Sequence, residues 1–103
     1  MSDALNRHRE LVQRFPDNEL ARFSLAKAMY DAGDFAPART ELEFCLQRKP
    51  DWMVAWILTG HCQLALGQRD AAKAAFTEAL RLARAQRHRD PAAELEELLR
   101  GLD

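Results

Sequence analysis

The sequence predicts an all-α protein built from antiparallel helical hairpins, and three observations lead to this fold class. The chain repeats its own pattern with a period of 34 residues, in the range expected for stacked supersecondary units. Glycine and proline divide it regularly into segments of helical length. No segment alternates apolar and polar residues with period two, so we expect no β-sheet.

The repeat preserves the sizes of residues more than their identities. Gly33 recurs as Gly67, and Leu42 recurs as Phe76. The same register pairs Ala38 with Ala72, Cys45 with Ala79, Leu46 with Leu80, and "RFPD" at 14–17 with "RKPD" at 48–51. We interpret the copies as two stacked helical hairpins, because packed positions in such arrays are constrained while surface positions drift.

Six helices are expected, joined by short connections that make neighbouring helices antiparallel. They span residues 3–14, 18–31, 35–48, 52–65, 69–87 and 91–101.

Residues suited to helix starts lie at the expected boundaries. Ser2 can cap the first helix, and either Asp17 or Asn18 can cap the second. Asp51 and Asp90 precede the fourth and sixth helices. Pro37 and Pro91 fall in first turns, where proline is tolerated.

Length and charge limit the classes of function. The chain has 103 residues, which suits a single small domain over 1–103, and its net charge is −1. Such a balance argues against a surface for nucleic acid or anionic lipid. The start "MSDALNRHRE" lacks the apolar core of a secretory signal, and no apolar run reaches the ~18 residues of a membrane span. We therefore expect a cytoplasmic protein.

The repeated residues resemble the tetratricopeptide repeat (TPR), whose pattern combines large, small and aromatic residues on two helices with a closing proline. Matching residues in 53–86 are Trp56, Gly60, Gly67, Ala72, Phe76 and Ala79. Those in 19–52 are Leu25, Ala26, Met29, Gly33, Phe35, Ala38, Leu42, Cys45 and Pro50, and residues 3–16 look like a preceding half repeat with Ala4, Leu11 and Pro16 in register. The resemblance implies a right-handed helical-hairpin solenoid with a capping helix at 90–101.

Several positions depart from the TPR pattern. Arg22 stands where the first copy would carry an aromatic residue, and Arg84 replaces the closing proline of the second. The second change predicts that the fifth helix continues past the usual end. Further departures are Thr59, Gln63 and Arg69. Small residues such as Ala26 and Gly60 are expected where paired helices approach closely.

The resemblance implies a concave face lined by the first helix of each hairpin, where family members bind peptides or partner proteins. On this side of the helices lie two stripes of residues at helical spacing. The first stripe is Leu20, Phe23, Lys27 and Tyr30, and the second stripe is Val54, Ile57, His61 and Leu64. We expect a non-catalytic adaptor that binds a peptide or helix of a partner protein through these mostly apolar stripes.

Other interpretations of the stripes stay open. The terminal helices can close over them and make them core, or a second copy of the chain can cover them in a homodimer. The last helix, with Leu95, Leu98 and Leu99, is expected to cap the final hairpin, although it can also fold across the groove.

No residues suggest catalysis, a metal or a cofactor, so we expect none of these. His61 and Cys62 are adjacent on a helix and face different ways, and Cys45 suits packing better than redox chemistry. The basic end of the fifth helix comprises Arg81, Arg84, Arg87, His88 and Arg89. It can bind phosphate, but cations also suit a helix C-terminus, and we interpret it in that way.

Overall fold

The computed structural model describes residues 3–103, and this part of the chain forms six α-helices and no strand. The helices are α1 (Asp3–Arg14), α2 (Glu19–Asp31), α3 (Phe35–Arg48), α4 (Met53–Ala65), α5 (Arg69–Ala85) and α6 (Arg89–Leu102). The prediction of an all-α chain of about six helices is confirmed. Ser2, expected to cap α1, lies outside the described residues.

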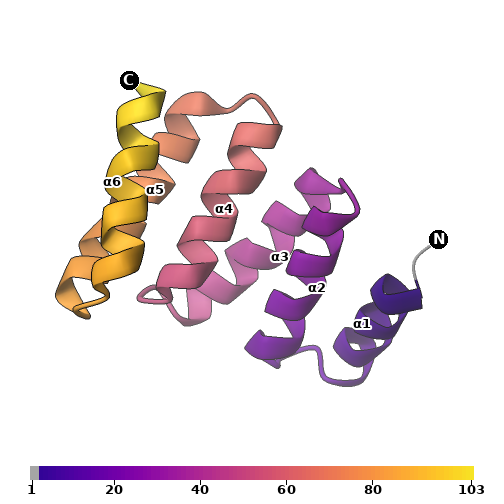
Figure 1. The fold of residues 1–103 in the computed structure, drawn as a ribbon. Helices are drawn as coiled ribbons and strands as arrows, with labels where there is room; N and C mark the ends of the chain where they lie inside the picture. Colours follow the sequence, from indigo (N-terminus) through magenta and orange to yellow (C-terminus); the bar gives the residue numbers. More distant parts are fainter. Residues whose placement is uncertain (1–2) are drawn as a thin grey trace. The chain divides into compact units, whose positions relative to one another are not determined.

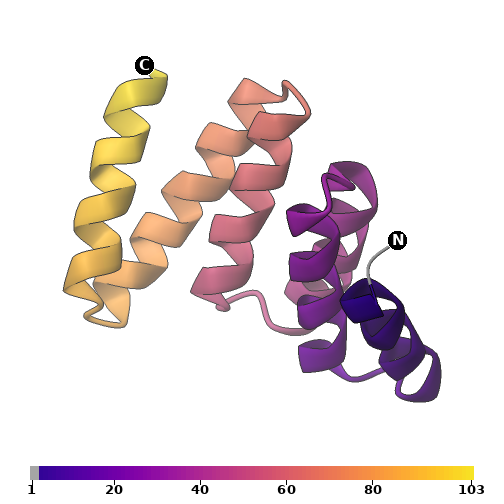
Figure 2. The same cartoon turned by 45° about the vertical axis from the view of Figure 1, so that its right-hand side comes forward.

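The chain divides into two compact units, Met1–Pro50 and Asp51–Asp103. In unit 1, α2 packs against both α1 and α3, and in unit 2, α5 packs against both α4 and α6 (Figures 1 and 2). Consecutive helices within each unit run in opposite directions (Figure 1). The single domain over 1–103 and its division into a half repeat, two repeats and a cap stay predictions.

The starts of the helices follow the predicted signals only in part. Asp51 precedes α4 but does not cap it, because the N-cap residue is Trp52. The side chain of Asn18, rather than Asp17, caps α2, because its Oδ1 accepts a hydrogen bond from the amide of Ala21 at 3.0 Å. Pro37 and Pro91 lie in the first turns of α3 and α6, as predicted. The prediction that Asp90 precedes α6 is wrong, because α6 already begins at Arg89.

Three helices end in the same hydrogen-bonded turn, with one residue in the left-handed region. After α2 this residue is Gly33 (φ 83°), and after α4 it is Gly67 (φ 76°). At Gly33, the amides of Gly33 and Asp34 donate to the carbonyls of Tyr30 and Met29, which is the Schellman pattern. After α5 the same pattern carries Arg87 at φ 61°, with bonds from Arg87 to Arg84 and from His88 to Ala83. As predicted, α5 therefore runs further than α3 before it ends.

Arg22 replaces an aromatic residue of the repeat by making three polar contacts. Its Nε donates to the carbonyl of Pro16 at 2.9 Å, and its Nη1 pairs with Glu41 at 2.9 Å. Its guanidinium also lies 4.3 Å from the ring centroid of Phe44. One side chain thus joins the α1–α2 connection, α2 and α3 through charge-assisted and cation–π contacts.

The core of unit 2 contains a close helix crossing in which a small residue faces a large one. In unit 2, Gly60 of α4 faces the fully buried ring of Phe76 of α5. A Cβ atom at Gly60 would lie only 2.5 Å from Phe76 Cε1. The positions one repeat earlier are the fully buried Ala26 and Leu42 of unit 1. The expectation that Gly60 is small because the helices approach closely is confirmed.

Helix α6 covers the outer side of α5. Ala92 and Leu95 are buried in the core of unit 2, and Leu98, Leu99 and Leu102 pack against it. Polar contacts hold the end of α6 beside the start of α5. Arg69 Nη2 donates to the carbonyl of Leu102 at 2.6 Å, and Lys73 pairs with Asp103 at 2.6 Å.

Replacement of Gly60 by alanine is expected to destabilise the protein by about 1–3 kcal/mol, because the new methyl group would overlap a buried ring that has no room to move. The double variant Gly60→Ala, Phe76→Leu imitates the pair in unit 1 and should recover part of the loss. Chemical denaturation measures both effects. Gly101→Ala is the control, since nothing lies within 4 Å of its added Cβ. A Gly60→Ala variant as stable as this control would contradict the close crossing.

Replacement of Arg87 by glycine is expected to stabilise the protein by about 1 kcal/mol. A residue with a side chain costs about 1–2 kcal/mol in the left-handed region, and glycine removes this cost. Part of the gain is offset because glycine loses more conformational entropy on folding. The reciprocal variant Gly67→Ala should lose a similar amount. Both are measured by thermal and urea denaturation. Equal stability of wild type and Arg87→Gly would show that no strain is held at this turn.

Candidate partner-binding site

The first stripe combines one highly exposed residue with three that have intramolecular contacts. Leu20 at the start of α2 is 64% exposed. Phe23 and Tyr30 are half-buried, and the ring of Tyr30 meets the edge of Phe35 at a centroid distance of 5.4 Å. Lys27 is exposed, with its Nζ 2.9 Å from both carboxylate oxygens of Asp31. The lysine charge is thus partly neutralised within its own helix.

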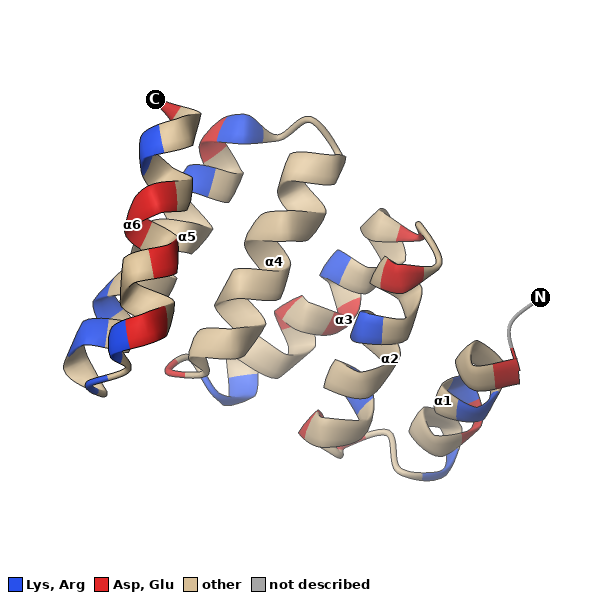
Figure 3. Ribbon diagram, viewed as in Figure 1, with Lys and Arg blue, Asp and Glu red and all other residues tan. Residues whose placement is uncertain are grey.

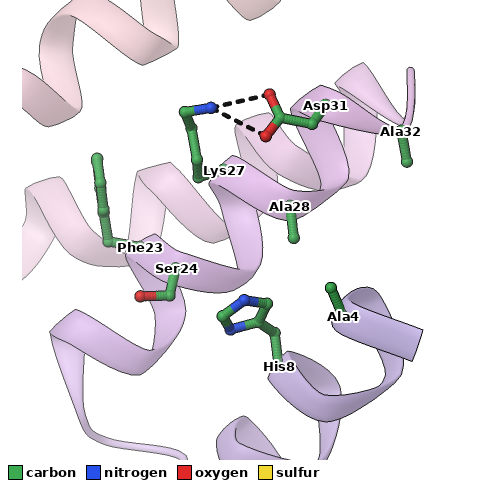
Figure 4. A pocket seen from close by; sticks show the side chains of 8 residues that line it. All are labelled: Ala4, His8, Phe23, Ser24, Lys27, Ala28, Asp31 and Ala32. Carbon is green, nitrogen blue, oxygen red and sulfur yellow. Dashed lines mark hydrogen bonds and ion pairs between the residues drawn. The ribbon is translucent and has the colours of Figure 1, made fainter. Parts of the chain in front are cut away.

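A cavity of about 460 Å³ lies between α1 and α2, beside the first stripe. We call it the α1–α2 cavity. His8 of α1 points toward α2, where Ser24 and Ala28 face it, while Phe23 and Lys27 project from another side of the helix (Figure 4). The remaining lining residues are Ala4, Asp31 and Ala32. The Nδ1 atom of His8 is buried and has no hydrogen-bond partner among the described residues. The cavity therefore offers a polar group inside a mainly apolar wall.

The second stripe, like the first, begins with an exposed apolar residue, but its third residue is half-buried where Lys27 is exposed. Val54, which lies 34 residues after Leu20, is 47% exposed at the start of α4. Ile57, His61 and Leu64 are half-buried, and Ile57 and Leu64 pack against the core of unit 2. The stripe is thus neither free along its whole length nor closed over, and its first residue is the most accessible.

A second cavity, of about 270 Å³, lies between α4 and α6. We call it the α4–α6 cavity. Ile57 and His61 line it on one side, and Pro91, Glu94, Leu95 and Leu98 line it on the other. Helix α6 therefore borders the second stripe at Ile57 and His61. A ligand group that enters here would meet apolar side chains, one imidazole and one carboxylate.

The surroundings of His61 favour the neutral form of its imidazole. Its ring meets the edge of the Phe76 ring at a centroid distance of 5.1 Å. Burial lowers the pKa of His61 below its ordinary value of 6.5, because the charged form loses hydration. A neutral ring can both donate and accept a hydrogen bond at the cavity wall.

Four of the eight predicted stripe residues line the two cavities, and most of the other lining residues were not predicted as site residues. The structure brings Phe23 and Lys27 together at one cavity, and Ile57 and His61 at the other, whereas Leu20, Tyr30, Val54 and Leu64 line neither. A detectable signal for the α1–α2 cavity was the row of small residues at i, i+4 and i+8 formed by Ser24, Ala28 and Ala32. The cavity residues that the sequence analysis did not assign to the binding site include Ala4, His8, Ser24, Ala28, Asp31, Ala32, Pro91 and Glu94.

The cysteines are buried, one in each unit. Burial, and next the charge of Glu41, raise the pKa of the Cys45 thiol to about 11, and its Sγ lies 3.6 Å from the carbonyl of Glu19. This thiol is therefore protonated and a weak nucleophile at neutral pH. Between residues 3 and 103, no three histidine, cysteine or acidic residues are grouped to hold a metal ion. In the same range, no helix is both long and apolar enough to cross a membrane.

Comparison with known proteins identifies the family. Residues 1–51 match the protein-family model of the tetratricopeptide repeat. A TPR repeat-containing protein of Pseudomonas aeruginosa is 33% identical over 94 residues, which cover 91% of this chain and 90% of that protein. The chain belongs to the tetratricopeptide repeat family. The resemblance seen in the sequence is thereby confirmed.

Solved structures agree with a TPR fold. The solution structure of a Bordetella parapertussis protein matches 99% of this chain and 89% of that one, with a TM-score of 0.84 and 28% identity. The crystal structure of PcrH in complex with the chaperone binding region of PopD matches 97% of this chain and 76% of PcrH, with a TM-score of 0.89 and 22% identity. The all-α helical repeat predicted from the sequence is therefore the fold of this TPR protein.

Stability is expected to fall when the pH drops below about 6.5, because the folded protein favours the neutral form of His61. In that range the unfolded chain binds a proton that the folded chain does not, so the free energy of unfolding decreases as pH falls. The slope should stay below the limit of about 1.4 kcal/mol per pH unit that one proton sets. Urea denaturation between pH 5 and 8 measures it for wild type, His61→Gln and the exposed-histidine control His88→Gln. If His61→Gln showed the same dependence of unfolding free energy on pH as wild type, the dependence would not come from His61.

Proposed function

We propose that this TPR protein is a non-catalytic interaction module, an adaptor that binds a peptide or helix of a partner protein on its two stripes. The observation that carries the proposal is the exposure of Leu20 and Val54. These apolar residues occupy equivalent positions in the two copies, each on a stripe whose next residues border a cavity. Exposed apolar residues that recur in register favour contact with another molecule over isolated surface exposure.

The chemistry of the stripes suits a largely apolar ligand with few charges. Lys27 pairs with Asp31, and the surroundings of His61 favour its neutral form, so neither stripe holds strong unpaired charge. A partner helix could place side chains at i, i+3 and i+7 against Leu20 and Phe23 of unit 1, or against Val54 and Ile57 of unit 2. Membership of the TPR family and the PcrH complex with a region of PopD support a protein partner.

The test uses the exposed residues, because Ile57 packs against the core and its replacement could unfold unit 2. The variant Leu20→Asp, Val54→Asp should capture far less partner than wild type in cross-linking followed by quantitative mass spectrometry. Each apolar anchor contributes about 1.5–3 kcal/mol when it is buried, and thus roughly tenfold or more in affinity. Circular dichroism verifies that each variant is folded.

The matched control is Ala36→Asp, Ala74→Asp, which adds the same charge at exposed positions of α3 and α5. A partner lost by the stripe variant and kept by the control supports the proposal, whereas a partner kept by both refutes it. Analytical ultracentrifugation at increasing protein concentration tests the alternative, in which a second copy of this chain binds the stripes. A homodimer that dissociates in the stripe variant would identify a second copy of this chain as the ligand.

A further inference from the structure

The connection between α5 and α6 borders a cavity to which three arginines contribute. Its volume is about 380 Å³, and we call it the α5–α6 cavity. It is lined by Ala83, Arg84, Arg87, His88, Arg89 and Ala92. Basic residues gather at this connection, whereas acidic residues follow along α6 (Figure 3). None of these lining residues belongs to the stripes or to the other two cavities described above.

Two of the arginines are available for a ligand. In the described part of the chain, no carboxylate pairs with Arg87 or Arg89, whereas Arg84 pairs with Glu96 at 2.9 Å and Arg81 with Glu78 at 2.7 Å. Arginine stays charged at every physiological pH. The cavity thus carries surplus positive charge in a chain whose net charge is −1.

The backbone gives a second reason to regard Arg87 as more than a surface residue. The same turn ends α2 and α4, and there it uses Gly33 and Gly67. Arginine at φ 61° costs stability that glycine would not. A residue that breaks a local rule without a structural benefit is typical of a functional position. Among the described residues, the side chain of Arg87 forms no hydrogen bond, ion pair or ring contact that would offset this cost.

We propose that the α5–α6 cavity binds a single small oxyanion, a phosphate or carboxylate group, between the guanidinium groups of Arg87 and Arg89. Planar guanidinium groups match two oxygens of such an anion and form charge-assisted hydrogen bonds with them. An extended polyanion fits poorly, because Glu94, Glu96 and Glu97 follow on α6 and would repel the neighbouring phosphates. This site is independent of the function proposed for the stripes.

Phosphate titration followed by ¹⁵N–¹H NMR tests the site at constant ionic strength, with chloride as the competing ion. The amide signals of Arg84, Arg87, His88 and Arg89 should shift with one saturable affinity. The variant Arg87→Gly, Arg89→Gln should bind at least about tenfold more weakly, since hydrogen bonds to charged groups contribute about one order of magnitude each. Arg87→Gly is chosen because it suits the left-handed backbone and is expected to keep the turn folded.

The matched control is Arg7→Gln, Arg9→Gln, which removes the same charge from exposed positions of α1. It should bind phosphate as wild type does. Equal phosphate affinity of wild type and the variant Arg87→Gly, Arg89→Gln would refute the site. Amide chemical-shift changes spread evenly over α1 and α5 would also refute it. A second arm compares inorganic phosphate with N-acetyl-phosphoserine amide and N-acetyl-glutamate amide. If either amide binds more tightly than inorganic phosphate, the ligand is an oxyanion on a protein side chain. If neither amide binds more tightly, the ligand is free phosphate.

Discussion

The close approach of α4 and α5 at Gly60 is the constraint on which the packing of this hairpin depends. Helices at ordinary distance accept many side chains between them, but at Gly60 the neighbouring helix leaves no room even for a methyl group. Phe76 fills the space that glycine leaves, and the equivalent positions of unit 1 carry the fully buried Ala26 and Leu42. The repeat therefore conserves the combined size of the pair more than either residue. This explains why the two copies share a plan without sharing a sequence.

The fold could be predicted from the sequence because its signals are local and periodic. Breakers at Gly33 and Gly67 fix helix ends through a positive φ that other residues avoid, so the helix boundaries followed from one-dimensional spacing. The end of α5 was predicted less accurately, because the residue in the left-handed conformation there is Arg87 and not a glycine. Helix α6 consequently begins earlier than predicted, and Asp90 lies inside it.

The candidate site was predictable only in part, for a physical reason. Spacing on a helix shows which residues share a side, and of the predicted stripes Phe23 with Lys27 and Ile57 with His61 line cavities. It does not show which residues a neighbouring helix contributes, so His8 of α1 and Glu94 of α6 were not assigned. Arg22 illustrates the same limit in the core. Its place in the pattern suggested a lost aromatic contact, and only the three-dimensional neighbours Glu41 and Phe44 explain its presence.

Each unit contains one buried thiol whose chemical modification can be used to follow the opening of that unit. Cys45 lies in unit 1 and Cys62 in unit 2, and a thiol reagent can reach either one only when the surrounding helices separate. The rate at which each cysteine is modified is therefore set by the opening of its own unit. Equal rates would mean that the halves of the chain open as one cooperative body, whereas different rates would mean that each hairpin group opens separately. The wild-type sequence thus allows the cooperativity of a repeat protein to be measured without an added label.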